Sequence, residues 1–188
     1  EAGVHSGDST CVLPPHTLSL DIQARICEAT EMMALELGVI GLMNVQYAVK
    51  RDTLYVIEVN PRASRTVPFV AKATGIPVAK IAAKVMCGKT LKELNFTSRP
   101  VLDYFAVKAP VFPYNKFPGT EVMLGPEMRS TGEVMGMDKN LGVAFLKAFY
   151  GAGMKLPKHG RVLITVKSEH KRSIVPEAQL LLHMGYEL

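Results

Sequence analysis

The sequence predicts an α/β protein in which helices flank an antiparallel β-hairpin and the start of a second α/β domain follows. Two β-rich runs, residues 42–49 and 54–59, are separated by only four residues, which is typical of a hairpin. Segments of helical periodicity stand on both sides of these runs. A strand-and-helix pattern begins again near residue 159. The 188 residues are 48% apolar and 21% charged, as in an ordinary folded protein.

The first helix is expected between residues 19 and 37. Ser19 suits an N-cap, apolar residues recur at roughly helical spacing from Ile22 to Leu37, and Gly38 can end the helix. Its expected role is to cover a sheet.

After the hairpin, residues 77–88 read as a second helix, with Pro77 near its first turn. A strand is expected over residues 104–107. From Pro110 onward repeated prolines exclude long regular elements, so residues 109–128 are predicted to form a connector or an extended packing arm. A short helix is expected over residues 141–150.

Residues 159–188 read as a strand, a turn, a helix and the first residues of another strand. One strand and one helix cannot bury their own apolar faces. We therefore expect residues from about 151 onward to belong to a second α/β domain that is incomplete.

Charge and cysteine content restrict the class of ligand and the setting. Lys and Arg outnumber Asp and Glu by 22 to 17, but they are scattered and not interleaved with aromatic residues. This pattern favours an anionic small molecule and predicts no nucleic-acid partner. No long apolar run or signal-like opening is present, so no membrane association is expected. Cys11, Cys27 and Cys87 lack disulfide or zinc spacing and are expected to be reduced, in an intracellular setting.

Polar side chains gather at the end of the second hairpin strand. Glu58 and Asn60 are two residues apart in a strand and therefore share a face. If residues 51–53 form a three-residue loop, Gln46 lies directly opposite Glu58, with Cβ atoms roughly 4.5–5.5 Å apart. A two-residue turn would shift the register by one and move Gln46 to the other face.

These three side chains would offer only oxygen atoms, which suit Mg²⁺ or Mn²⁺ far better than zinc. Arg62 and Arg65 follow closely, and guanidinium groups bind phosphate or carboxylate oxygens in a bidentate manner. Such a site would neutralise the charge on a phosphoryl group in transfer. The alternative is that Glu58 and both arginines are ordinary surface residues beside an Asn-Pro turn.

The opening of the chain is the second candidate site. Gly3 and Gly7 allow close approach of a ligand to the backbone, Ser6 offers a hydroxyl, and Val4 and His5 could contact a nucleotide. The alternative is an ordinary turn. No Walker A loop, catalytic triad or H-E-x-x-H motif is present.

Five segments together resemble the large-subunit family of carbamoyl phosphate synthetases, in the carboxy-terminal half of that chain. They are "AGVHSGDS", "GLMNVQYAV", "YVIEVNPRASRTVPFVAKATG", "NKFPG" and "GPEMRSTGEVMG". The resemblance runs over essentially all 188 residues. The E-x-N-x-R core alone is shared by many ATP-grasp enzymes, whereas the longer segments are more specific.

The resemblance implies a reaction and a fold. The family makes carbamoyl phosphate from bicarbonate, ammonia released from glutamine, and two ATP, with two ATP-grasp units in one chain. Residues 1–88 would be the C-terminal lobe of the second unit, which phosphorylates carbamate, and residues 89–150 a connector that completes it. Residues 151–188 would begin the Rossmann-like, methylglyoxal-synthase-like regulatory domain, with a nucleotide effector near Lys171.

The resemblance also implies residue roles. Gln46, Glu58 and Asn60 would be ligands of Mg²⁺ or Mn²⁺. ATP would contact Gly3, Val4, His5, Ser6, Gln46 and Glu58. Arg62 and Arg65 would contact phosphoryl oxygens or carbamate. A potassium ion near Val4 and Ser9 is a further expectation.

The expected partners are a glutaminase small subunit, the remainder of the large chain, carbamate derived from bicarbonate, and a nucleotide effector. The expected context is pyrimidine and arginine biosynthesis in the cytoplasm, with an organellar address left open. The other half of the nucleotide grasp should precede Glu1, so the segment alone is expected to be inactive. Two alternatives remain: another ATP-grasp ligase, such as a biotin-dependent carboxylase subunit, or a non-catalytic effector-binding module.

Overall fold

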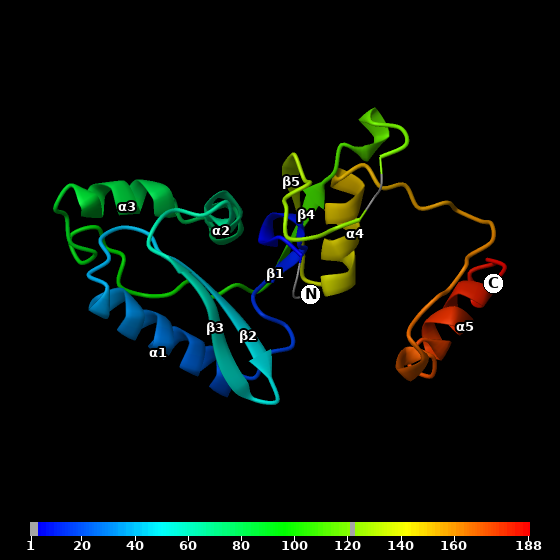
Figure 1. Ribbon diagram of the computed structural model, residues 1–188, viewed down its shortest axis with the longest axis horizontal. Helices are drawn as coiled ribbons and strands as arrows, with labels where there is room; N and C mark the ends of the chain where they lie inside the picture. Colours follow the sequence, from blue (N-terminus) through cyan, green and yellow to red (C-terminus); the bar gives the residue numbers. More distant parts are fainter. Residues whose placement is uncertain (1–3, 121–122) are drawn as a thin grey trace. The chain divides into compact units, whose positions relative to one another are not determined.

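A computed structural model describes residues 4–120 and 123–188. The chain divides into two compact units, Glu1–Gly153 and Met154–Leu188, and the elements of each are shown in Figure 1. Gly3, predicted to contact a nucleotide, lies outside the described residues. Among the helices of the described ranges, none has the length and apolar character needed to cross a membrane.

The predicted helix and hairpin are confirmed. Helix α1 spans Leu20–Glu36, and the Ser19 hydroxyl oxygen accepts a hydrogen bond from the Ile22 N–H at 3.3 Å. Strands β2 (Asn44–Lys50) and β3 (Thr53–Asn60) form an antiparallel pair. Helix α1 runs beside this pair, and the Thr30 and Tyr47 hydroxyls lie 2.6 Å apart between them (Figure 1).

A second, three-stranded antiparallel sheet has the order β1-β4-β5, from Cys11–Leu13, Phe105–Val111 and Gly132–Asp138. Its two faces are covered by different helices, because successive strand residues point to opposite faces. Val107 and Ala109 pack against helix α4, Leu141–Gly151, on one face. Ala106 packs on the other face against helix α2, Thr66–Thr74. The first unit thus has two small cores that share β4.

Strands β1 and β5 were not expected from the sequence, and helix α2 and the extent of β4 also differ from the expectation. No helix was expected over Thr66–Thr74, where α2 forms; Pro68 is tolerated because it lies in the first turn, where a backbone N–H has no helical partner to lose. Strand β4 continues through Pro110, which was expected to end it. Strand β1 pairs with β4 only as far as Lys108, so the missing N–H of Pro110 faces no neighbouring strand on that side.

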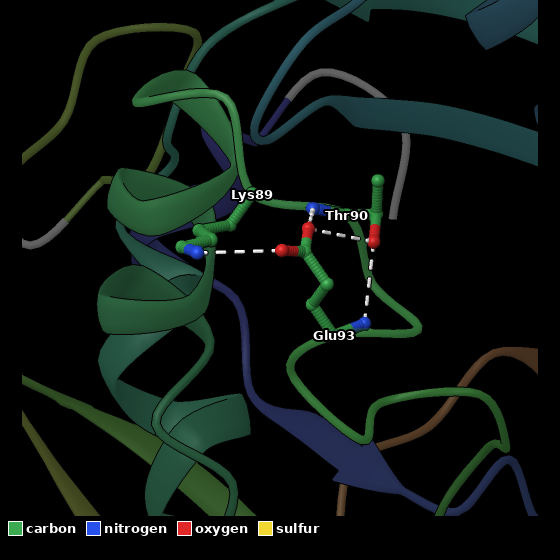
Figure 2. Close-up of polar contacts among 3 residues, drawn as sticks. All are labelled: Lys89, Thr90 and Glu93. Atoms are coloured by element: carbon green, nitrogen blue, oxygen red, sulfur yellow. Dashed lines mark hydrogen bonds and ion pairs between the residues drawn. The ribbon is translucent and has the colours of Figure 1, made fainter.

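Helix α3, Val78–Met86, confirms the expected second helix, and a single helical turn follows it. Figure 2 shows how that turn is closed at its start. The Thr90 N–H donates to Glu93 Oε2 at 2.8 Å and the Glu93 N–H donates to Thr90 Oγ1 at 3.2 Å, a reciprocal capping box. Lys89 Nζ lies 3.3 Å from Glu93 Oε1. The bonds from Thr90 and Lys89 hold the pKa of Glu93 below its usual value.

The second unit contains helix α5, Val175–His183, as expected, but the strand expected at the start of residues 159–188 is absent. A single parallel bridge, Arg161 to Glu187, takes its place. Leu163 is 89% exposed, so this segment lacks the covering layer that a parallel strand needs. A Rossmann-like domain is therefore not shown by residues 154–188. Short 3-10 turns occur at Ser6–Asp8, Tyr114–Lys116 and Ser168–His170.

Candidate functional site

The β2–β3 register places Gln46 opposite Glu58, as predicted, but by a different route. The hairpin turn has two residues, Arg51 and Asp52, with left-handed φ values of 49° and 60°. A regular ladder from that turn would pair Gln46 with Ile57. A β-bulge skips Ile57 and restores the pairing of Gln46 with Glu58. The predicted three-residue loop was therefore wrong, but the predicted position of Gln46 opposite Glu58 is confirmed.

The polar end of this hairpin forms the first wall of a cavity of about 550 Å³. Gln46, Glu58 and Asn60 all line it. The Asn60 amide nitrogen donates to Glu58 Oε1, so the amide oxygen is left for another partner. Asn44, directly opposite Asn60, lines the same wall and was missed. Its position two residues before Gln46 was the signal that could have found it.

The second wall contains Arg62 and Arg65 at the beginning of helix α2. The Arg62 N–H donates to the Asn60 carbonyl at 2.8 Å, so the chain turns sharply after β3. Arg65 is the N-cap residue of α2, and no side chain caps that helix. Both guanidinium groups and the positive end of a helix dipole therefore border a cavity that also contains a carboxylate and amides. Such a surface suits phosphate oxygens.

The third wall is the loop Val4–Ser9, of which Val4, His5, Ser6 and Ser9 line the cavity. The Gly7 N–H donates to His5 Nδ1 at 3.0 Å, and the His5 N–H donates to the Gly125 carbonyl at 2.9 Å. His5 therefore shapes its own loop with Nδ1 and retains Nε2 for a ligand. The structure brings every described residue of the predicted nucleotide site to one cavity.

Hydrogen bonds to the carboxylate of Asp8 anchor this loop. Its carboxylate accepts the Arg129 N–H at 2.8 Å and the Ser130 N–H at 2.9 Å, and the residue is buried. Burial by itself raises the pKa of Asp8. Hydrogen bonds from the Ser130 side chain and from both N–H groups outweigh burial and lower the pKa below its usual value.

We expect Asp8→Asn to destabilise the fold by about 1–3 kcal/mol at pH 7, because one N–H loses its charged acceptor. A lowered pKa in the folded state means that the ionised carboxylate stabilises the fold above the unfolded pKa of about 4. That contribution disappears as the pH falls through the folded pKa. Urea unfolding should therefore show that the unchanged protein has a higher free energy of unfolding than the Asp8→Asn protein. We expect this difference to be greatest at pH 7 and to become smaller below about pH 4.

The matched control is Asp103→Asn, since Asp103 makes only an exposed ion pair with Lys139 at 3.7 Å. Equal stabilities of the Asp8→Asn protein and the unchanged protein at pH 7 would contradict the anchoring role. A difference in their free energies of unfolding that increases as the pH is lowered would contradict it as well.

The fourth wall is formed by strands β1, β4 and β5. Cys11, Lys108 and Glu133 line the cavity from these strands. Lys108 is only 1% exposed, and Glu133 is exposed. Neither charged residue was predicted, because a lysine in a strand and a glutamate after a glycine carry no sequence signal of their own.

The family described as "Carbamoyl-phosphate synthase L chain, ATP binding domain" matches residues 2–94. This match covers just under half of the chain. The matched residues carry the hairpin, the loop and both arginines, so most of the cavity lining lies in the part of the chain that is similar to an ATP-binding domain.

Similarity to the carbamoyl phosphate synthase large chain extends over the whole sequence. The chain is 55% identical over 188 residues to that of Myxococcus xanthus and 54% identical over 188 residues to that of Vibrio cholerae. It is 53% identical over 190 residues to that of Methanobrevibacter smithii. All 188 residues are covered in each case, but only 17–18% of the relative's length. The resemblance found in the sequence is confirmed, and the chain spans less than a fifth of its curated relatives.

The fold is also similar to that of a solved structure, the biotin carboxylase domain of a single-chain bacterial carboxylase. The TM-score is 0.56 at 18% identity, over 71% of this chain and 37% of the other. The predicted α/β class with an antiparallel ATP-grasp lobe is thereby confirmed at the level of fold.

The donor set of the cavity fits a hard cation. Within residues 4–120 and 123–188, no three His, Cys, Asp or Glu side chains form a metal-binding group. Gln46, Glu58 and Asn60 instead offer one carboxylate and two amides, all through oxygen. Mg²⁺ takes few protein ligands and fills its other positions with water and phosphate. The residues present therefore fit Mg²⁺ or Mn²⁺ better than zinc.

Proposed function

We propose that this chain is part of a glutamine-dependent carbamoyl phosphate synthase and contributes to the site that phosphorylates carbamate with ATP. One observation carries the proposal. Glu58, Gln46 and Asn60 face the same cavity as Arg62 and Arg65, in a segment whose family is described as ATP-binding. Metal ligands and phosphate-binding guanidiniums in one cavity are what phosphoryl transfer requires.

In the proposed step, a carbamate oxygen forms a bond to the γ-phosphorus of ATP. The bond from that phosphorus to the β–γ bridging oxygen breaks, and its electron pair leaves with ADP, so the products are carbamoyl phosphate and ADP. Arg62 and Arg65 bind phosphoryl oxygens and hold the reactants in line. A divalent cation on Glu58 would reduce the negative charge of the phosphates.

The other parts of the proposal follow from the family. Val4, His5 and Ser6 contact the nucleotide, as does Gly3 outside the described residues, and a potassium ion binds near Val4 and Ser9. A glutaminase small subunit, the remainder of the large chain and an effector near Lys171 are the proposed partners. Lys171 follows the Ser168–His170 turn. The proposed context is arginine and pyrimidine biosynthesis in the cytoplasm.

The test is ATP synthesis from ADP and carbamoyl phosphate by an intact large chain that carries this segment. We expect ATP formation that requires Mg²⁺ or Mn²⁺. No ATP from carbamoyl phosphate, together with biotin-dependent ATP hydrolysis, would replace the proposal with a carboxylase function. Effector binding without either reaction would replace it with a regulatory module.

A further inference from the structure

A second cavity, of about 350 Å³, is lined by helix α3 and by the turn that follows it. Its apolar lining consists of Ile81 on α3 and of Leu94 and Phe96 after the helix, all half-buried. Its charged lining consists of Lys80 and Lys84, both exposed. Of the residues that the structure describes, none lines both this cavity and the larger one, so the two are separate places on the molecule.

Local hydrogen bonds fix the wall of this second cavity that follows α3. The capping box of Thr90 and Glu93 closes the start of the turn (Figure 2). The Leu94 N–H then donates to the Thr90 carbonyl at 3.2 Å, and the Phe96 N–H donates to the Leu91 carbonyl at 2.9 Å. The apolar side chains are therefore presented by a backbone that is already held in place, as in most small-ligand sites.

Positive charge gathers around this cavity. Residues 77–96 contain four lysines and a single acidic residue, Glu93, which pairs with Lys89. Within the part of the chain that the structure describes, neither Lys80 nor Lys84 takes part in an ion pair. These two lysines are one helical turn apart, and like charges at that spacing destabilise a helix. An anion held between the two ammonium groups would remove this repulsion.

Two further lining residues suit an anion. Asn95 has a left-handed φ of 52°, which asparagine adopts more readily than most residues, and its amide nitrogen can donate to an anion. Pro77 is the N-cap residue of α3, and its side chain has no group that could accept from the first N–H groups of the helix. The positive end of the helix dipole therefore adds to the charge of the lysines.

We propose that this cavity binds a small amphipathic anion, with its carboxylate or phosphate group on Lys80 and Lys84 and its apolar body on Ile81, Leu94 and Phe96. The volume is near the lower limit for small-ligand cavities, so the ligand is small. An inorganic anion would leave the apolar lining unused, and a neutral apolar compound would leave both ammonium groups without a partner. The inference does not depend on the proposed function, because the nucleotide would occupy the other cavity.

The test is a ligand-observed NMR titration of an intact large chain with hexanoate. Acetate is the matching anion without an apolar body, and hexanamide is the matching neutral compound. We expect hexanoate to bind at least about tenfold more tightly than acetate, because each buried methylene adds up to about fourfold in affinity. It should bind about fivefold or more tightly than hexanamide, and binding should weaken at high salt. Hexyl phosphate identifies the anionic group: tighter binding than hexanoate assigns a phosphate, and weaker binding assigns a carboxylate.

Variants locate the binding on the chain. Replacing both lysines, in Lys80→Gln/Lys84→Gln, should weaken hexanoate binding by about tenfold, the product of two exposed ion pairs, and leave hexanamide binding unchanged. The matched control is Lys92→Gln, because Lys92 is exposed in the same turn but does not line the cavity. It should change the affinity for hexanoate by less than about twofold.

Several results would overturn the inference. Equal affinities for acetate and hexanoate would mean that the lysines attract any counter-ion, and equal affinities for hexanoate and hexanamide would mean that charge is not recognised. Displacement of hexanoate by MgADP would place the ligand in the nucleotide cavity instead. Absence of hexanoate binding by the intact chain would mean that another part of the large chain covers the second cavity. None of these results would alter the test of the proposed function, which measures ATP formation.

Discussion

Glu58→Gln should abolish ATP synthesis from ADP and carbamoyl phosphate in an intact large chain. Glu58 is the only carboxylate among the three proposed metal ligands, and its neighbours on the cavity wall are the amides of Gln46 and Asn60. Replacing it leaves three neutral ligands for a divalent cation. Loss of a partner that only orients a ligand costs about 10- to 100-fold, so loss of the charged ligand should exceed 100-fold.

The measurement is the initial rate of ATP formation at several Mn²⁺ concentrations, together with the Mn²⁺ affinity of each protein. We expect weaker Mn²⁺ binding by Glu58→Gln and partial recovery of rate at high Mn²⁺. Glu36→Gln, at the exposed end of α1, is the matched control and should behave as the unchanged protein. Normal rates at ordinary Mn²⁺ would remove Glu58 from the metal site.

The sequence predicted the local parts of this site, because strand alternation is a property of a few neighbouring residues. Glu58 and Asn60 share a face for that reason alone. The position of Gln46 does not follow from strand alternation alone. The turn at Arg51 and Asp52 and the bulge at Ile57 each shift the register by one, and only together do they bring Gln46 opposite Glu58. Nothing in the residue types marks that bulge.

Long-range packing explains what could not be predicted. In the sequence Lys108 looks like any lysine in a strand. Its burial depends on distant parts of the chain, helix α2 on the same face of the sheet and the Val4–Ser9 loop. Helix α2 was missed: Pro68 is acceptable only in a first turn, and the position of that turn depends on the sharp chain reversal after Asn60. The strand expected at the start of residues 159–188 shows the converse error, since a good strand sequence without neighbouring strands to pair with does not form a strand.

Gly136→Ala should be the most destabilising small substitution in the first unit. Gly136 is buried in β5 where helix α4 crosses the sheet. A Cβ there would overlap the Ala144 carbonyl oxygen and the Ala148 backbone nitrogen, and would lie 2.9 Å from Lys147 Cβ. Backbone atoms cannot rotate away as a side chain can, so the helix must shift from the sheet. We expect a loss of about 3 kcal/mol, at the upper end for overpacking.

Native-state hydrogen exchange is the best measurement, because it reports on β4, β5 and α4 separately from the rest of the chain. Gly132→Ala is a matched control in the same strand, since its Cβ would meet only Val111 Cβ at 4.0 Å. We expect protection in β5 and α4 to fall sharply in Gly136→Ala and to persist in Gly132→Ala. Because β4 also carries Lys108, the shifted helix should disturb the cavity wall. Unchanged hydrogen-exchange protection in Gly136→Ala would mean that α4 does not pack this closely on β5.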